Sequence, residues 1–179
     1  MIILMGVIGA GKSIQGKLFT DELGYAWIST GNLFRAFITG ERRKEVFSGK
    51  LLSDEEVIEL VQKAFKNIDL NQEFVIDGFP RTKGQTEWLI KEIESGEIKL
   101  TAIFNLIASE EEVIKRLLAR GREDDQIDII KTRFEEFKNK TLPIINVFKK
   151  EGIKVIDIDA NKPPMEVHKE IISHLPEIE

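Results

Sequence analysis

A glycine-rich segment near the start of the chain, Gly6-Val7-Ile8-Gly9-Ala10-Gly11-Lys12-Ser13, constrains its fold and chemistry more than any other feature. An apolar run at residues 1–5 precedes it and an amphipathic stretch at 13–23 follows, so we expect a strand, a turn and a helix. In that context G-x-x-x-x-G-K-[S/T] is typical of a phosphate-binding loop. Its backbone N–H groups and the helix N-terminus attract anions, and Lys12 adds a full charge. A plain glycine turn is the alternative, and we favour the nucleotide site.

The composition of the 179-residue chain limits the functions that it can have. A net charge of −5 argues against a nucleic-acid-binding surface. The absence of cysteine excludes disulfides, thiol catalysis and cysteine-based zinc sites. The N-terminal apolar run is too short to cross a membrane and leads straight into the glycine-rich segment. We therefore expect one domain in a cytoplasmic, monomeric protein without a membrane partner.

Apolar runs that alternate with helical patterns predict the fold class. The runs lie at residues 2–5, 25–28, 74–76, 102–106 and 154–158. This alternation is typical of an α/β fold in which helices cover both faces of a five-stranded parallel sheet. Between residues 30 and 71 we find no strand, only short helical pieces, which indicates a helical insertion. Ser53-Asp54-Glu55-Glu56 is a capping box for a helix that we expect to extend to about residue 66.

An aspartate ends the third predicted strand, where parallel sheets present functional groups. In a protein with a phosphate-binding loop, Asp77 can hold Mg²⁺ through water while the Ser13 hydroxyl is a direct ligand. The alternative is an aspartate that only caps the turn at Gly78. The position by itself does not decide between these two interpretations.

Six ordered motifs resemble the adenylate kinases over nearly the whole chain. They are the glycine-rich segment with Gln15, the run Ser29-Thr30-Gly31-Asn32-Leu33-Phe34-Arg35, the run Asp77-Gly78-Phe79-Pro80-Arg81-Thr82 with Gln85, the arginines 116, 120, 122 and 133 with Asp124-Asp125, the element Thr141-Leu142-Pro143-Ile144, and the loop Asp159-Ala160-Asn161-Lys162-Pro163. The resemblance implies a P-loop kinase that moves the γ-phosphoryl group of ATP·Mg²⁺ to a nucleoside monophosphate. We expect AMP as the acceptor and ADP as the product.

The resemblance also assigns residues to each substrate. The ATP side would comprise Gly9, Ala10, Gly11, Lys12, Ser13, Ile14, Arg116, Arg120 and Lys162. The monophosphate side would comprise Thr30, Arg35, Lys50, Leu51, Leu52, Gly78, Phe79, Pro80, Arg81, Gln85, Arg122 and Arg133. The catalytic groups would be Lys12, Arg81, Arg120, Arg122 and Arg133, with Mg²⁺ held by Ser13 and, through water, by Asp77. Residues 30–66 would form the monophosphate-binding insertion, residues 121–123 a minimal lid, and residues 1–29, 67–120 and 124–179 the core.

The chemistry of phosphoryl transfer explains why arginines are needed. Two polyanions meet and charge spreads over the moving group, so positioning and cationic stabilisation do nearly all the work. Arginine is permanently charged and grips phosphate oxygens in pairs. Arg116 and Arg120 lie four residues apart on a predicted helix and therefore share one face. The Gln85 amide can both donate to and accept from the edge of adenine.

Two other functions stay open at this point. The acceptor can be UMP, CMP or another monophosphate, although a pyrimidine-specific relative more typically carries Asn at the position of Gln85. The chain can also be a nucleotide-binding regulatory protein with weak transfer, and a general ATPase is a third, weaker option. Ile14 stands where the family usually has a hydroxyl, and Asn32 stands where Asp is usual.

The short lid generates a prediction. Only residues 121–123 separate Arg120 from Asp124, whereas a longer lid excludes water from the site when it closes. We therefore expect either slower transfer or measurable hydrolysis of ATP. Phosphate release from ATP, measured with and without AMP, tests this. Tight coupling together with normal turnover would refute it.

Overall fold

A parallel sheet forms the centre of the computed structural model, which describes residues 1–47 and 52–176. Its strands are β1 (Ile2–Met5), β2 (Ala26–Ser29), β3 (Phe74–Asp77), β4 (Ala102–Ile107) and β5 (Val155–Asp159). They lie in the order β2-β3-β1-β4-β5, and every neighbouring pair is parallel. The α/β fold with a five-stranded parallel sheet is therefore confirmed, and the strand ends differ from the predicted ones by no more than one residue.

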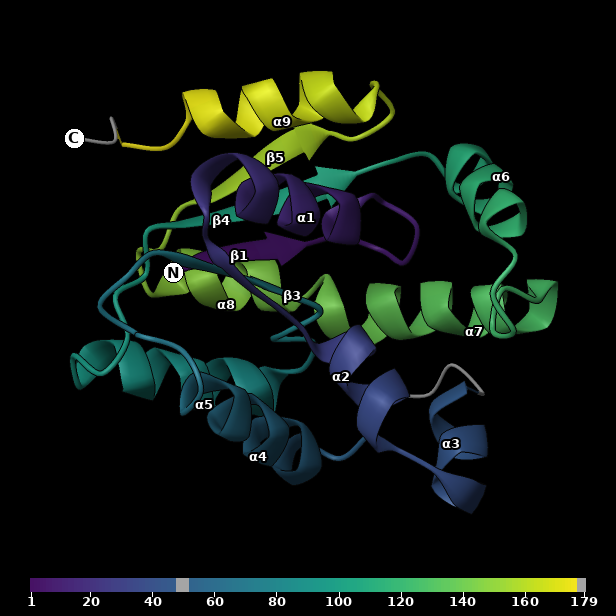
Figure 1. Ribbon diagram of the computed structural model, residues 1–179, viewed down its shortest axis with the longest axis horizontal. Helices are drawn as coiled ribbons and strands as arrows, with labels where there is room; N and C mark the ends of the chain where they lie inside the picture. Colours follow the sequence, from purple (N-terminus) through teal and green to yellow (C-terminus); the bar gives the residue numbers. More distant parts are fainter. Residues whose placement is uncertain (48–51, 177–179) are drawn as a thin grey trace.

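Helices cover both faces of this sheet, and each face has its own hydrophobic core (Figure 1). Buried side chains of α1 (Lys12–Leu23), α6 (Glu110–Arg120), α7 (Ile127–Glu136) and α9 (Pro164–Ser173) pack on one face. Those of α4 (Asp54–Phe65), α5 (Lys83–Glu94) and α8 (Ile144–Lys150) pack on the other. Alternate residues of a strand supply the two cores: Ile2 and Leu4 face the first, Ile3 and Met5 the second.

The predicted helical insertion consists of α2 (Thr30–Phe37), α3 (Gly40–Phe47) and α4 between β2 and β3. The capping box is confirmed: the Ser53 hydroxyl accepts from the Glu56 N–H, and the Glu56 carboxylate accepts from the Ser53 N–H. The helical spacing predicts that Val57, Leu60, Val61 and Phe65 face inward. Val57, Val61 and Phe65 are buried against the core, whereas Leu60 is only partly buried and is not part of that core. The insertion is thus anchored through α4.

The last helix is less buried than its sequence suggests. The sequence predicts one apolar stripe of Met165, Val167, Ile171 and Ile172. Ile172 is partly buried against the core, yet Met165 is 47% exposed. Val167 and Ile171 are four residues apart and face the core together. Met165 lies two residues before Val167, on the opposite side of the helix. The expectation for Met165 was therefore wrong.

A π-helical turn, Phe137–Thr141, joins α7 to α8. Pro143 has no N–H and its ring crowds the preceding turn, so a regular α-helix cannot continue through it. The Leu142 N–H instead donates to the Phe137 carbonyl oxygen at 2.7 Å. This geometry places the Thr141 hydroxyl 3.0 Å from the carbonyl oxygen of Arg81, to which it donates. The turn therefore connects α7 to the loop after β3.

Among the helices of residues 1–47 and 52–176, none combines the length and apolar character that crossing a membrane requires.

Strand β4 offers a matched test of the core. Phe104 is fully buried, whereas Ile107, three residues further along, is 49% exposed. We expect Phe104→Ala to lower the free energy of unfolding by about 3–5 kcal/mol, because it removes buried contacts and leaves a cavity. Ile107→Ala should cost about 1 kcal/mol or less. Urea denaturation of both variants measures the difference, and equal losses would contradict the assigned core.

Candidate active site

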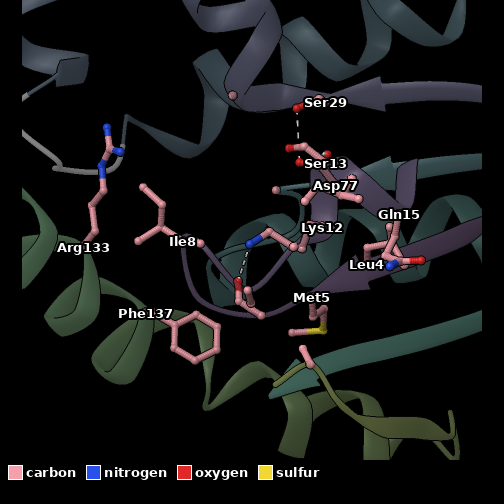
Figure 2. A pocket seen from close by; sticks show the side chains of 18 of the residues that line it. Leu4, Met5, Ile8, Lys12, Ser13, Gln15, Ser29, Asp77, Arg133 and Phe137 are labelled. Carbon is pink, nitrogen blue, oxygen red and sulfur yellow. Dashed lines mark hydrogen bonds between the residues drawn. The ribbon is translucent and has the colours of Figure 1, made fainter. Parts of the chain in front are cut away.

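A cavity of about 1010 Å³ opens at the carboxyl-terminal edge of the sheet. Its walls come from the loops after β1 and β3, from α2 and α4 of the insertion, and from α6 and α7. Figure 2 shows the part around Lys12, Asp77 and Arg133. Open α/β sheets bind ligands at this edge because loops that follow adjacent parallel strands converge there. The glycine-rich segment follows β1, the central strand, and so lies at the floor of the cavity.

The glycine-rich segment folds as a compact loop around the Lys12 ammonium group. Gly9 and Gly11 adopt positive φ angles of 78° and 98°, which residues with a side chain rarely do. Lys12 Nζ donates to the carbonyl oxygens of Gly6 and Val7, at 2.7 Å each. Burial lowers the pKa of Lys12 to about 8, against the opposing effect of the Asp77 carboxylate. The loop therefore has the curled backbone and the cation that a phosphate group needs.

Asp77 accepts hydrogen bonds from three side chains. Trp27 Nε1 donates to Oδ2 at 2.8 Å and the Ser29 hydroxyl donates to Oδ1 at 3.2 Å. The Ser13 hydroxyl lies 3.4 Å from Oδ2 (Figure 2). These contacts direct the carboxylate toward the glycine-rich segment, which favours the functional interpretation of Asp77 over a turn cap. No motif in the sequence predicts these roles of Trp27 and Ser29, which depend on contacts between separate elements.

The residues around Asp77 fit a magnesium ion that is held mainly by a nucleotide. Mg²⁺ prefers oxygen ligands, keeps several waters and often binds through one carboxylate and substrate phosphates. Ser13 and Asp77 supply a hydroxyl and a carboxylate side by side. Within the described part of the chain, no three acidic, histidine or cysteine side chains gather into a metal-binding group. A site completed by phosphate oxygens agrees with this donor set.

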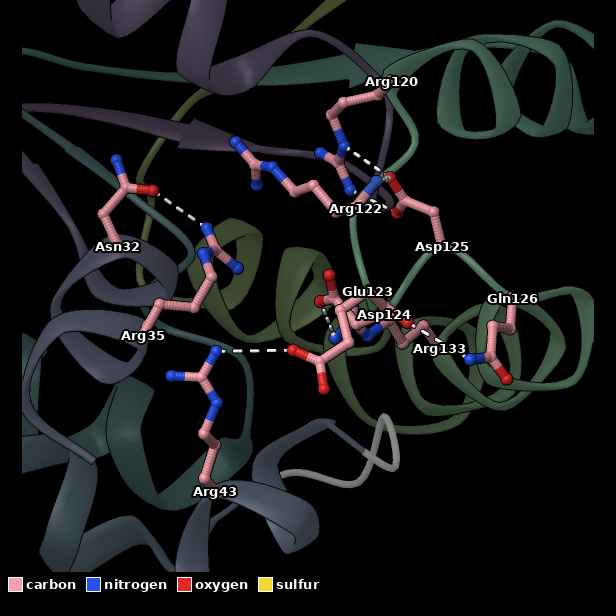
Figure 3. Close-up of polar contacts among 10 residues, drawn as sticks. All are labelled: Asn32, Arg35, Arg43, Arg120, Arg122, Glu123, Asp124, Asp125, Gln126 and Arg133. Carbon is pink, nitrogen blue, oxygen red and sulfur yellow. Dashed lines mark hydrogen bonds and ion pairs between the residues drawn. The ribbon is translucent and has the colours of Figure 1, made fainter. Parts of the chain in front are cut away.

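Two buried aspartates hold arginines at the rim of the cavity (Figure 3). Arg120 donates from Nε and one terminal nitrogen to both Asp125 oxygens, at 2.9 and 2.5 Å. Arg133 donates to Asp124 Oδ2 at 2.5 Å. The Arg122 backbone N–H donates to Asp125 at 3.0 Å. Asp124 and Asp125 are 2% and 6% exposed, so the pairs are shielded from water on the carboxylate side and fix the guanidinium groups.

Two further arginines reach the cavity from other elements. Arg81, in the loop after β3, donates from Nε to the Gly78 carbonyl oxygen at 2.7 Å. Arg35, on α2, donates to Asn32 Oδ1 at 2.8 Å (Figure 3). Burial lowers the pKa of Arg35, and the neighbouring charge of Arg122 lowers it further. Cations that repel one another in this way indicate a cavity suited to a polyanion.

The loop after β5 is tied to the glycine-rich helix and to α6. Arg116 donates to the Ala160 carbonyl oxygen at 2.8 Å and to Glu112 at 2.8 Å. Gln15 Nε2 donates to the Pro164 carbonyl oxygen, and its Oε1 lies 2.9 Å from Nδ1 of the buried His168. These contacts bring the loop beside the phosphate-binding segment, where it lines the same cavity.

The connection between α6 and α7 is short. It runs over residues 121–126 and contains no helix or strand. Glu123, at its tip, forms an exposed ion pair with Arg43 of α3 at 3.4 Å (Figure 3). The insertion and this connection therefore meet at the mouth of the cavity. The predicted boundaries of the insertion and the lid stay predictions.

The structure brings together nearly all of the residues that the sequence points to. The cavity lining includes every residue assigned to the ATP side, and Asp77. Of the residues that the resemblance assigns to the monophosphate, it includes Arg35, Leu52, Gly78, Phe79, Pro80, Arg81, Gln85, Arg122 and Arg133. Thr30 is not part of the lining, because it is buried and its hydroxyl donates to the Asp77 carbonyl oxygen. Lys50 and Leu51 lie outside the described residues.

The lowered pKa of Lys12 predicts how ligand binding changes with pH. Since the pKa lies below the usual value, Lys12 loses its charge above about pH 8. The affinity for ATP should therefore fall by about tenfold per pH unit above that point. Isothermal titration calorimetry between pH 7 and 10 measures this. Lys12→Met should bind weakly and without that decline, while Lys63→Met, at an exposed site on α4, should behave as the unmodified protein does.

Known proteins similar to this chain are adenylate kinases, in agreement with the motifs and with the geometry of the cavity. The family model described as "Adenylate kinase" matches residues 4–153. An adenylate kinase of Corynebacterium urealyticum is 36% identical over 165 residues, which cover 89% of this chain and 90% of that protein. One of Leptospira biflexa is 35% identical, covering 85% and 87% of the two chains, and one of Archaeoglobus fulgidus is 30% identical, covering 99% and 98%.

These matches span most of the chain and include the glycine-rich segment, β3 and the arginines of α6 and α7. The likeness extends over nearly the full length of the relatives, so it concerns the whole fold rather than one motif. The chain is a kinase that belongs to the adenylate kinase family.

Proposed function

We propose that this kinase transfers the γ-phosphoryl group of ATP·Mg²⁺ to AMP and forms two molecules of ADP. The observation that carries the proposal is the meeting of five arginines and a phosphate-binding loop in one cavity. These arginines, at positions 35, 81, 120, 122 and 133, come from separate elements and all line that cavity. A chain with a net charge of −5 concentrates positive charge there, as two polyanionic substrates require.

We expect two nucleotides to occupy opposite sides of the cavity. On one side, Lys12 and the backbone of residues 9–14 would hold the ATP phosphates, with Arg116 and the loop at Lys162 bordering the adenine. On the other side, the insertion and the loop after β3 would hold the monophosphate, with Arg35 and Arg81 at its phosphate. The phosphoryl group would pass between them, in reach of Arg120, Arg122 and Arg133.

The proposed reaction needs no general base, because the attacking phosphate oxygen of AMP is already ionised. The arginines orient the two substrates and stabilise the charge that spreads over the equatorial oxygens of the moving group. Ser13 and Asp77 would hold Mg²⁺, which neutralises phosphate charge when bound. We further propose that residues 30–66 rotate toward the core when AMP binds, which would exclude water.

The choice of AMP rests on Gln85. Gln85 is only 1% exposed, yet it lines the cavity. It is therefore not a solvent-facing residue of α5, and a primary amide suits an adenine edge. UMP or CMP as acceptor, and regulation with weak transfer, are the competing functions. The monomeric state and the cytoplasmic location stay predictions.

Arginine 81 provides the main test of the proposal. We expect Arg81→Ala to lower kcat for ATP-dependent conversion of AMP to ADP by about a thousandfold, because a phosphate-clamping cation is lost. This corresponds to about 4 kcal/mol of transition-state stabilisation. A coupled assay with AMP, UMP and CMP measures both the loss and the acceptor preference.

Lys83→Ala is the matched control, since Lys83 carries the same charge two residues further along but is exposed and pairs with Glu87. It should keep its activity. Equal effects of the two substitutions, or a higher kcat/KM with UMP or CMP than with AMP, would refute the proposal. Tight ATP binding without transfer to any monophosphate would instead favour a regulatory protein.

A further inference from the structure

The side-chain amide of Gln85 has a fixed hydrogen-bond partner on each side. Its Oε1 accepts from the backbone N–H of Arg81 at 2.8 Å, and its Nε2 donates to Asp54 Oδ1 at 3.0 Å. A backbone N–H only donates, and an ionised carboxylate only accepts. Turning the amide over would place two donors together on one side and two acceptors together on the other. The Arg81 N–H and the Asp54 carboxylate therefore allow only one of the two orientations of the Gln85 amide.

Asp54 is itself held in place from the core. It is the first residue of α4, in the insertion, whereas its partners lie at the start of α5. The Thr82 hydroxyl donates to the same Asp54 oxygen at 2.6 Å. Gly84 leaves room for the carboxylate, because a methyl group at that position would overlap Asp54 Oδ2. The residue pair Asp54 and Gln85 thus connects the insertion to the core through a partly buried hydrogen bond.

These bonds leave one lone pair on Oε1 and one N–H on Nε2 for a base. Adenine presents an amino donor beside a ring-nitrogen acceptor. With the amide fixed, Oε1 would accept from the amino group and Nε2 would donate to the ring nitrogen. Hypoxanthine and guanine present a carbonyl acceptor beside an N–H donor, which requires the amide to turn over. A glutamine without fixed partners can serve both orders, since its oxygen and nitrogen exchange places on rotation.

We propose that Asp54 is a positioning residue that makes the acceptor site select adenine over bases with the opposite edge. It acts through Gln85 and does not touch the substrate. The inference rests on the proposed function, since it assumes that Gln85 reads the base of the acceptor. It goes further by giving the direction of the discrimination: AMP is accepted, and IMP, GMP and UMP are rejected by an unmatched donor–acceptor order.

Asp54→Asn tests this proposal. Asparagine has nearly the same shape but can donate as well as accept, so residue 54 no longer selects one orientation of the Gln85 amide, and only the Arg81 N–H still does. We expect the ratio of kcat/KM for AMP to that for IMP to fall by about tenfold, through a higher KM for AMP and a lower KM for IMP. The kcat with AMP should change little, because no group at the phosphates is altered.

Gly84→Ala is a second, independent variant that leaves Asp54 and Gln85 intact but displaces the carboxylate, and it should change the ratio in the same direction. Glu55→Gln is the matched control: it removes the same charge from the next, exposed position of α4 and should leave the ratio unchanged. Thermal unfolding of each variant separates selectivity from folding. If Asp54→Asn does not fold, the ratio for Gly84→Ala decides.

The outcomes separate the two proposals. A lower AMP to IMP ratio in Asp54→Asn and Gly84→Ala, with Glu55→Gln unchanged, supports the assignment of Asp54. An unmodified protein that converts AMP, with variants that lose AMP and IMP turnover equally, overturns the role of Asp54 and leaves the proposed function standing. An unmodified protein that phosphorylates no monophosphate overturns both.

Discussion

Like charges share one cavity in this protein, and a few buried carboxylates keep them there. Lys12 and the arginines at positions 35, 81, 120, 122 and 133 face the same space, where their mutual repulsion opposes folding. Asp124 and Asp125 each bind a guanidinium group, and Asp77 lowers the cost of burying Lys12. The cations exceed these carboxylates, so the cavity keeps a positive potential for anionic ligands. Phosphate groups of bound nucleotides would offset this excess positive charge.

The topology of the sheet decides where these groups meet. β1 lies at the centre with β3 and β4 beside it, so the glycine-rich segment and Asp77 leave adjacent strands at one edge. α6 and α7 bring their arginines to that edge from one side, and the insertion brings Arg35 from the other. The π-helical turn before Pro143 adds a contact to the backbone of Arg81. Each element contributes only one or two groups, and none of them forms a site alone.

Much of this arrangement could be predicted because its signals are local. The loop between β1 and α1, the capping box at Ser53 and the alternating cores follow from residues close together in the chain. Predictions were weaker where rotation or long-range packing mattered. Met165 is half exposed, and the bond from the Thr30 hydroxyl to the Asp77 carbonyl oxygen has no signal in the sequence. Gln85 was recognised as a candidate, but its orientation depends on a partner 31 residues away.

The sequence by itself determined the order of strands and helices along the chain, the phosphate-binding loop and the resemblance to the adenylate kinases. These features follow directly from residue type and spacing. Only the tertiary structure decided how the functional groups are held. Trp27 and Asp77 are 50 residues apart and Asp54 and Gln85 are 31 apart, yet both pairs form hydrogen bonds. No local periodicity encodes such contacts, since they arise when separate elements pack around a shared core. The motifs therefore indicate which functional groups are present, and tertiary packing determines how those groups are positioned.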